Sequence, residues 1–479
     1  MLPDLPLPKS TRPAAGLPRH PTGRNSLAEL ARCVSPRNPI ESGRFRRVSL
    51  PVVRFATPGN CPILPSGRRH HDFSDTEVRP MPKFLGRIEF PCTIELGRGL
   101  EGAITNVTRI GYVNGEEGHL NYRGYSIEDL SDNCSYEEVA YLLIFGKLPN
   151  RAELNTFQLR LRKSGELPEE IIRIIETLPR DAHPMNVLQT GVAAFGCLDR
   201  DSLEVTRHVS DPAAALEIET EIAIRIMART RSIAAAIARA RKGQAVLQPD
   251  PNLSFTGNYL YQMSGEKPSP VTEKLMDICL ILQADHGMNA STFTAVVTHS
   301  TLSDMYSTIA AAIGSLRGPL HGGANEAALE ELAAIGGPEK AKAWVAEKIA
   351  KGQKVIGFGH RVYKAYDPRA LVLKKHAEAL CREKGMESLY RTAVEVENLF
   401  LAEMKAKGKP IYPNVDYYSG IVYHALGFPT PLFPVIFAVS RTAGWAARVL
   451  EYLPENRIFR PRAVYDGPTD LKVVPIEKR

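Results

Sequence analysis

Apolar side chains recur at helical spacing along most of the chain, beginning with the segment that follows Ser135. Ser135 and Glu138 have the spacing of a capping box, and Gly146 follows the last apolar residue of that segment. The only extended pattern is short, at residues 87–96, and no repeat of fixed length indicates a solenoid. The same helical spacing predicts further helices over residues 151–163, 168–178, 213–241, 271–284, 304–316, 325–335, 339–351, 368–384, 387–407, 419–426 and 434–453. We therefore predict an all-α protein.

Length and composition are those of a globular protein with two domains. The chain has 479 residues, of which 44% are hydrophobic and 24% are charged, and a domain usually takes roughly 100 to 200 residues. The longest apolar stretch, 427–438, is interrupted by Pro429, Pro431 and Pro434, so it does not resemble a membrane-spanning helix. We expect no membrane function.

The net positive charge lies in the first 80 residues, which hold 13 Lys and Arg against 6 Asp and Glu. In the rest of the chain acidic and basic residues are equal in number, so a basic surface for nucleic acid has no support there. Residues 1–80 also hold 13 of the 36 prolines, and we predict that they are disordered. Three origins remain open: a wrongly assigned start upstream of Met81, an organellar targeting peptide, or a genuine tail.

Cysteine and histidine spacing argues against disulfide and metal frameworks. The seven cysteines are scattered and odd in number, which favours a reducing compartment. We expect the cytoplasm, or an organellar matrix if residues 1–80 are a targeting peptide. The twelve histidines show no metal-ligand spacing, so no metal is predicted.

A glycine-flanked histidine is the first candidate for chemistry. The glycines of Gly357-Phe-Gly-His360 allow a tight turn, and Arg369 follows nine residues after the histidine. A titratable imidazole and a guanidinium that pairs with carboxylates suit a small dicarboxylate substrate. A structural or merely exposed histidine is the alternative.

Two further motifs combine a turn with the start of a helix. His321 precedes a helix expected from about Ala324, whose positive end disfavours imidazolium, so His321 should be neutral and able to donate to a carbonyl. Asp416 opens another helical run as either an N-cap or a general base. A helix-capping role stays open for His321 as well.

Three other positions suit an anion. His286 follows the helix expected at 271–284, where it or Asn289 could be only a cap. Arg441 lies inside an apolar helix, where it needs a buried carboxylate or an anionic ligand. Arg460 lies in a polar stretch that would ordinarily be solvent-exposed.

Together these segments resemble the citrate synthase family over nearly all of residues 91–470. The matching runs are 110–125, 286–292, 318–325, 357–369, 414–420, 440–445 and 460–462. The resemblance implies a Claisen-type condensation of acetyl-CoA with oxaloacetate and water to give citrate and free coenzyme A. By this resemblance Asp416 removes a methyl proton, His321 hydrogen-bonds the thioester oxygen, and His360 polarises and protonates the oxaloacetate carbonyl.

The resemblance also implies the remaining parts of the site. His286, Arg369 and Arg441 would surround oxaloacetate, and Arg460 would reach in from the other subunit of a homodimer. No permanently bound cofactor is implied, because coenzyme A is a co-substrate. The coenzyme would lie against residues of the loop around His360 and two lysines, namely Val355, Gly357, Phe358, Lys364 and Lys409.

The family fold would be a large helical domain of residues 91–322 and 428–479, with a small helical domain of 323–427 inserted. A rival is 2-methylcitrate synthesis from propionyl-CoA, although the run from Arg361 to Lys364 looks more like the citrate enzymes. A non-catalytic scaffold is expected to lack at least one of the three catalytic residues, and all are present. Gly287 and Arg448 depart from the family pattern, and we expect neither to touch a catalytic group.

Overall fold

The computed structural model describes residues 98–100, 102–205, 212–463, 468 and 470–479. Met1–Ile104 and Thr105–Arg479 form separate units. In the first unit the described part includes a 3-10 turn, Arg98–Leu100, whose last carbonyl accepts a hydrogen bond from the amide of Ala103 at 3.0 Å. The predicted disorder of residues 1–80 and the extended stretch at 87–96 lie outside the described residues.

Thr105–Arg479 is mostly helical, which confirms the predicted fold class. α2 (Tyr136–Phe145) begins at the predicted capping box of Ser135 and Glu138 and ends at Gly146. Most other predicted helices lie within a few residues of their expected bounds: α3 (Arg151–Ser164), α4 (Glu169–Thr177), α7 (Pro212–Arg241), α9 (Pro270–Gln283), α11 (Met305–Leu316), α12 (Ala324–Ile335), α13 (Ala341–Ala350), α14 (Pro368–Glu383), α15 (Glu387–Ala406) and α17 (Phe433–Tyr452).

The structure also has elements that the periodicity did not predict. A small antiparallel sheet has the order β1 (Gly111–Asn114), β2 (His119–Tyr122), β3 (Tyr125–Ser126). α16 begins four residues before the predicted start, because Asn414 caps it. Serine, threonine and glycine blur the apolar spacing in most of the helices that were missed: α1 (Ile127–Asn133), α5 (Pro184–Gly196), α6 (Arg200–Val205), α8 (Phe255–Ser264) and α10 (Ala290–His299).

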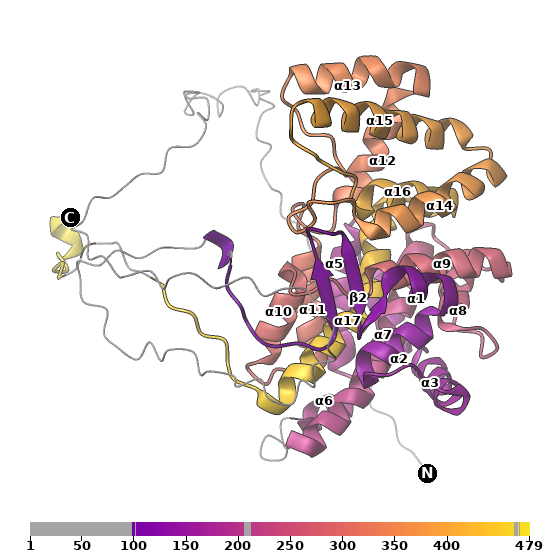
Figure 1. Cartoon of the computed structure of the whole chain (residues 1–479). Helices are drawn as coiled ribbons and strands as arrows, with labels where there is room; N and C mark the ends of the chain where they lie inside the picture. Colours follow the sequence, from indigo (N-terminus) through magenta and orange to yellow (C-terminus); the bar gives the residue numbers. More distant parts are fainter. Residues whose placement is uncertain (1–97, 101, 206–211, 464–467, 469) are drawn as a thin grey trace, which may run out of the picture. The chain divides into compact units, whose positions relative to one another are not determined.

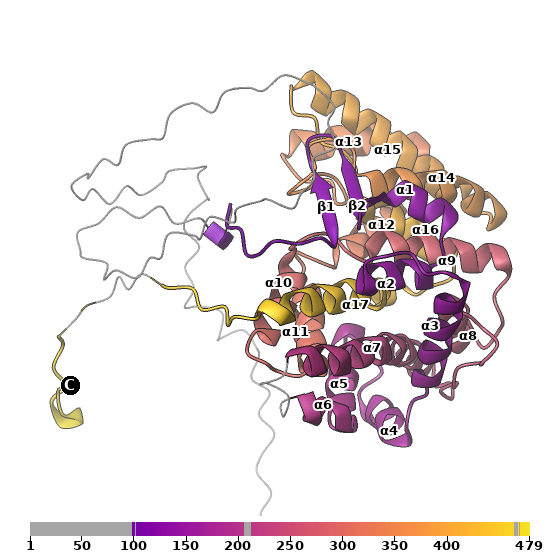
Figure 2. The ribbon, with the colours of Figure 1, turned by 60° about the horizontal axis from the view of Figure 1, so that its bottom comes forward.

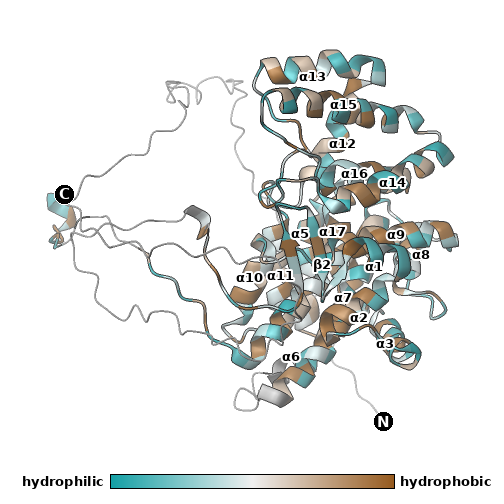
Figure 3. Cartoon of the chain, viewed as in Figure 1, coloured by the Kyte–Doolittle hydropathy of each residue, from teal (hydrophilic) through white to brown (hydrophobic). Residues whose placement is uncertain are grey.

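α17 is the central helix of the core. Every residue from Phe433 to Leu450 is buried, because α17 packs against α2, α7, α9, α10 and α11 (Figure 2). By contrast, α14 and α15 carry hydrophilic and hydrophobic residues in alternation (Figure 3), as expected of helices with one buried face. Polar side chains on α17 are therefore enclosed by protein, and any charge there depends on its immediate neighbours.

The predicted site residues come from two groups of helices. α12, α13, α14, α15 and α16 (Val415–Ala425) pack on one another and lie together at the top of Figure 1. His360, Arg369 and Asp416 belong to this group. His286 and His321 lie on the connections after α9 and α11, and Arg441 lies on α17. In the part of the chain that the structure describes, no helix combines the length and apolar character needed to cross a bilayer.

Gly444 lets α17 approach the connection that carries His286. A Cβ atom added there would lie 2.1 Å from the carbonyl oxygen of Ala284. That atom belongs to the backbone and cannot rotate away, so the helix or the connection would have to move.

We predict that Gly444→Ala lowers the free energy of unfolding by about 3 kcal/mol, the upper part of the usual range for an overpacked core. Denaturant unfolding would measure the change. The control is Gly323→Ala, where the added Cβ comes no nearer than 4.0 Å to the closest atom, Pro319 Cα. Equal stability of the two variants would contradict the close approach of α17.

Candidate active site

Arg441 is a buried cation without a carboxylate hydrogen-bonded to it among the described residues. Its side chain is 1% exposed, Nε donates to the carbonyl of Gln283 at 2.6 Å, and Nη1 has no hydrogen-bond partner in the described part of the chain. Burial, together with the smaller effects of the Arg369 and Arg448 charges, lowers the pKa of Arg441 to about 10, although Asp285 opposes the shift. A buried guanidinium needs either a buried carboxylate or an anionic ligand, and an anionic ligand is therefore the partner that fits Arg441.

Arg441 shares one face of α17 with two aromatic residues, Phe437 and Trp445, at intervals of four residues. The Arg441 guanidinium carbon lies 4.8 Å from the centre of the Phe437 ring. The ring of His321 lies 6.3 Å from that of Phe437, and Trp445 Nε1 donates to Ser291 Oγ at 3.2 Å. This face of α17 therefore connects the segments that carry His321 and His286.

His321 is held by Ser291. Its Nε2 accepts the backbone N–H of Ser291 at 3.3 Å and lies 2.8 Å from Ser291 Oγ. Because an N–H group can only donate, the neutral ring carries its proton on Nδ1. Burial, followed by the charge of Arg441, lowers the pKa of His321 to about 4.

His321 is neutral, as predicted, but burial rather than the helix end is the main cause. The capping interpretation is wrong, because Gly323 is the N-cap of α12 and no side chain caps it. Ser291 was not among the residues predicted for the site, and its only signal in the sequence is its place in the run 286–292.

His360 is oriented by the turn that its glycines form. Gly357 has φ +83°, and a Cβ there would lie 2.9 Å from the Tyr417 side chain, so the position requires glycine. Nδ1 of His360 accepts the backbone N–H groups of Val362 at 3.0 Å and Tyr363 at 3.1 Å. The proton of the neutral ring is therefore on Nε2. Burial, followed by the charge of Arg369, lowers the pKa of His360 to about 4.

His286 lies beside His360, with their ring centres 5.2 Å apart. It is buried, and its Nε2 lies 3.1 Å from the hydroxyl of Tyr363. Burial, together with Arg369, lowers its pKa well below the ordinary value, so the ring is neutral. Asn289, and not His286, is the N-cap of α10.

Asp416 carries a carboxylate oxygen that accepts no hydrogen bond. The N-cap interpretation is wrong, because Asn414 Oδ1 caps α16 and accepts the Asp416 amide at 3.0 Å. Oδ1 of Asp416 is shielded from solvent and has no partner among the described residues. Burial raises the pKa of Asp416 to about 6, although the charges of Arg369 and Arg441 oppose it. A carboxylate in this state suits a general base near neutral pH.

Asn414 ties the segment of Asp416 to the turn of His360. Its backbone N–H donates to the carbonyl of Gly357 at 2.8 Å, and its side-chain amide donates to the carbonyl of Gly359 at 2.9 Å. The two segments therefore share one set of hydrogen bonds.

Arg369 is paired with Asp367, which was not among the predicted site residues. Nε and Nη2 of Arg369 donate to the two oxygens of Asp367 at 3.0 and 2.8 Å. Burial alone would lower the pKa of Arg369, but Asp367 more than offsets it and the pKa is raised. Asp367 also accepts the amide of Val415 at 3.2 Å, next to Asp416. Nη1 of Arg369 is not engaged by Asp367.

Arg448, one of the two departures from the family pattern, forms a buried ion pair with Asp285. Nε and Nη2 of Arg448 donate to the Asp285 carboxylate at 3.1 and 2.6 Å. Asp285 immediately precedes His286 and also accepts the amide of Gly287 at 3.2 Å. Arg448 thus touches no predicted catalytic group but does support the connection that carries His286.

The residues predicted to contact coenzyme A are less closely grouped than those predicted for oxaloacetate. The Val355 side chain is buried, and Phe358 packs edge-on against Phe400 and Tyr417 at 4.8 Å each, so both side chains face the protein. Lys364 is exposed and paired with Glu116, and Lys409 is exposed.

Arg460 is also exposed, and within a single chain no described contact joins it to the other site residues. Among the described residues, no three His, Cys, Asp or Glu side chains are grouped as a metal site would require.

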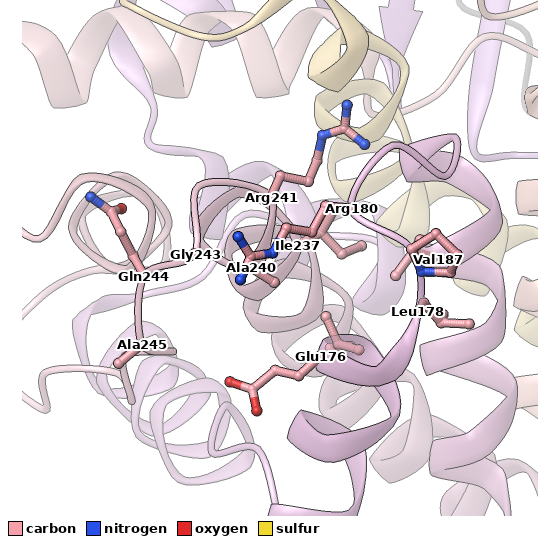
Figure 4. Close-up of a pocket in the computed structure, with 12 residues that line it drawn as sticks. Glu176, Leu178, Arg180, Val187, Ile237, Ala240, Arg241, Gly243, Gln244 and Ala245 are labelled. Atoms are coloured by element: carbon pink, nitrogen blue, oxygen red, sulfur yellow. The ribbon is translucent and has the colours of Figure 1, made fainter.

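A cavity of about 350 Å³ lies beside His360. Its lining includes Tyr363, Lys364, Asp367 and the segment from Pro410 to Pro413. A second cavity, of about 260 Å³, lies between α4, α5 and the end of α7, where Glu176 and Arg180 are among its lining residues (Figure 4). It contains none of the predicted site residues.

Comparisons with known proteins identify the family of this chain. A family model described as citrate synthase, C-terminal domain, matches residues 99–462. The chain belongs to the citrate synthase family. A citrate synthase of Deinococcus radiodurans is 42% identical over 384 residues, which cover 80% of this chain and 99% of that protein.

Solved citrate synthase structures are similar over the same region. The enzyme from Pyrobaculum aerophilum has a TM-score of 0.77 and 41% identity, and the match covers 82% of this chain and 99% of that one. A ternary complex of the Thermoplasma acidophilum enzyme with carboxymethyl coenzyme A and oxaloacetate has a TM-score of 0.73 and 36% identity, covering 81% and 100%.

The relatives favour citrate formation over the alternative. A 2-methylcitrate synthase of Shewanella oneidensis is 38% identical over 384 residues, below the citrate synthase of D. radiodurans over a stretch of equal length. The chain is therefore an acyltransferase-type enzyme of the citrate synthase family, whose reaction is the Claisen condensation of acetyl-CoA with oxaloacetate.

We predict that kcat/KM of this citrate synthase family enzyme rises with pH through about 6. Asp416 accepts a proton only when ionised, and its pKa is raised to about 6, so activity is lost as the pH falls below that value. His321 and His360, with pKa values of about 4, stay neutral across this range. The pH profile of kcat/KM measures the effect.

The matched variant is Asp416→Asn, which replaces the carboxylate with an amide of nearly the same size. We expect a loss of about 10²- to 10⁴-fold in kcat, the usual contribution of a general base, and loss of the acidic limb. An acidic limb near pH 6 that persists in the variant would show that another group titrates.

Proposed function

We propose that His321, His360 and Asp416 carry the condensation of acetyl-CoA with oxaloacetate to citrate and free coenzyme A. The observation that carries the proposal is that, among the described residues, Arg441 Nη1 has no hydrogen-bond acceptor and Asp416 Oδ1 has no hydrogen-bond donor. A dianionic substrate can accept from Arg441, and a carbon acid can give a proton to Asp416.

On the acetyl-CoA side, Asp416 removes a methyl proton while His321 donates its Nδ1–H to the thioester oxygen. A neutral imidazole suits this task, because it can donate a hydrogen bond to the developing enolate oxygen. An imidazolium could instead give its proton to the Asp416 carboxylate, which must stay ionised to act as the base. Ser291 supports the proposed tautomer by donating its backbone N–H to Nε2.

On the oxaloacetate side, His360 donates its Nε2–H to the ketone and transfers that proton as the carbon–carbon bond forms. His286, Arg369 and Arg441 bind the substrate carboxylates. Arg441 contributes most to charge recognition, since Asp367 already neutralises Arg369. Hydrolysis of the thioester then releases citrate and coenzyme A.

We further propose two domains, residues 91–322 with 428–479 and residues 323–427, which close around the substrates. In support, His360, Arg369 and Asp416 belong to the segment from α12 to α16, whereas His286 and Arg441 do not. The loop of Val355, Gly357 and Phe358 would contact coenzyme A mainly through its backbone. Lys364 and Lys409 are exposed and could reach its phosphates.

Substrate choice is tested by thiol release from acetyl-CoA and propionyl-CoA, each with and without oxaloacetate. We expect oxaloacetate-dependent release with a higher kcat/KM for acetyl-CoA. Some activity on propionyl-CoA is expected, because one methylene changes binding by only about 1 to 3 kcal/mol. A preference for propionyl-CoA would assign 2-methylcitrate synthesis instead.

A mixed dimer tests whether Arg460 acts across a homodimer. Arg460→Ala subunits and Asp416→Asn subunits carry different affinity tags, so that mixed dimers can be purified. If Arg460 acts in the partner's site, one site of each mixed dimer is intact, and about half of the wild-type activity returns. If Arg460 acts within its own subunit, both sites stay defective and the mixed dimer is as inactive as its parents.

A further inference from the structure

Tyr363 contacts both histidines that flank the proposed oxaloacetate site. Its hydroxyl lies 3.1 Å from Nε2 of His286, and its backbone N–H donates to Nδ1 of His360 at 3.1 Å. No other described residue contacts both rings through hydrogen bonds.

The Tyr363 ring also forms a wall of the same site. Its centre lies 4.7 Å from that of His360 and 5.4 Å from that of His286, and the Arg369 guanidinium carbon lies 6.0 Å above it. The side chain is 5% exposed, yet Tyr363 lines the cavity of about 350 Å³ beside His360. Its position is therefore determined by packing, so its hydroxyl is a rigid anchor.

The Tyr363 hydroxyl is suited to hold the His286 imidazole in one orientation while a ligand binds. A tyrosine hydroxyl can donate or accept, so it can bond to Nε2 of His286 in either tautomer. Burial raises the pKa of Tyr363, which keeps the hydroxyl neutral at ordinary pH. Without it, Nε2 of His286 has no hydrogen-bond partner among the described residues, and the ring is free to change its orientation.

We propose that Tyr363 is a positioning residue for oxaloacetate: its hydroxyl, 3.1 Å from Nε2 of His286, holds that imidazole in the orientation that binds the dicarboxylate. The proposal rests on the role of His286 in the proposed function. It assigns no step of proton transfer to Tyr363, because acetyl-CoA activation belongs to His321 and Asp416.

The first test is Tyr363→Phe, which deletes the hydroxyl and keeps the ring. We expect the KM and Kd for oxaloacetate to rise about fivefold to tenfold, which corresponds to the loss of one hydrogen bond. The KM for acetyl-CoA and kcat should change less than about twofold. Kinetics and calorimetric titration of oxaloacetate into the full-length protein measure these quantities.

The matched control is Tyr366→Phe, on the same loop. The Tyr366 hydroxyl donates to Glu397 at 2.8 Å, so its deletion also removes a tyrosine hydrogen bond, one that does not involve His286. Thermal unfolding of both variants separates stability from binding. If the KM for oxaloacetate rises equally in the two variants, the rise comes from a general loosening of the loop. That outcome would overturn the proposal.

A double-mutant cycle shows whether Tyr363 acts through His286. In a His286→Ala background, or His286→Gln if the alanine variant does not fold, Tyr363→Phe should no longer change oxaloacetate affinity. An undiminished effect in that background would mean that the hydroxyl contacts the substrate directly, which overturns the positioning role.

The same series distinguishes failure of this inference from failure of the proposed function. If His286→Ala weakens oxaloacetate binding but Tyr363→Phe does not, only the inference about Tyr363 is overturned. If His286→Ala leaves oxaloacetate affinity unchanged, the proposed role of His286 is wrong and the inference fails with it.

Discussion

The buried charge of Arg441 is the constraint on which the rest of the site depends. Its guanidinium is enclosed by α17 and its neighbours. Nε donates to a backbone carbonyl, and Nη1 has no hydrogen-bond partner among the residues that the structure describes. Its charge acts on His286, His321 and Asp416, lowering the pKa of each. Two other buried guanidinia near the site, on Arg369 and Arg448, are neutralised by Asp367 and Asp285. Of these three arginines, Arg441 is therefore the one whose charge is left for an anionic substrate.

Neutral histidines follow from the same arrangement. A positively charged imidazole would add to the charge of Arg441 in a region of low dielectric, so burial and the neighbouring arginines both keep the rings neutral. Backbone N–H groups then select the tautomers, on Nδ1 in His321 and on Nε2 in His360. The result is two fixed N–H donors and one carboxylate of raised pKa, the set of groups that enolate formation and carbonyl addition require.

Much of the fold and the identity of the candidate residues could be predicted, but their states could not. The capping box at Ser135 and the long helices are local features, so periodicity located them. Asp416 was ambiguous because an aspartate at the start of a helical run is usually an N-cap, and only the structure shows that Asn414 takes that role. Asp367, Ser291 and Tyr363 were missed because each contacts another site residue, and their places in the runs 286–292 and 357–369 were the only signal for them.

By itself, the sequence determined the helical class, the glycine-flanked turns and the residue types available for chemistry, because these depend on contacts within a few positions of the chain. The tertiary structure alone decided which arginine of the site lacks a paired carboxylate, which ring nitrogen of each histidine carries a proton, and that the pKa of Asp416 is raised. Trp445 reaches Ser291 across 154 positions, and Arg448 reaches Asp285 across 163. Electrostatic and hydrogen-bond energies depend on distance in space and on burial, and neither quantity can be derived from the spacing of residues along the chain.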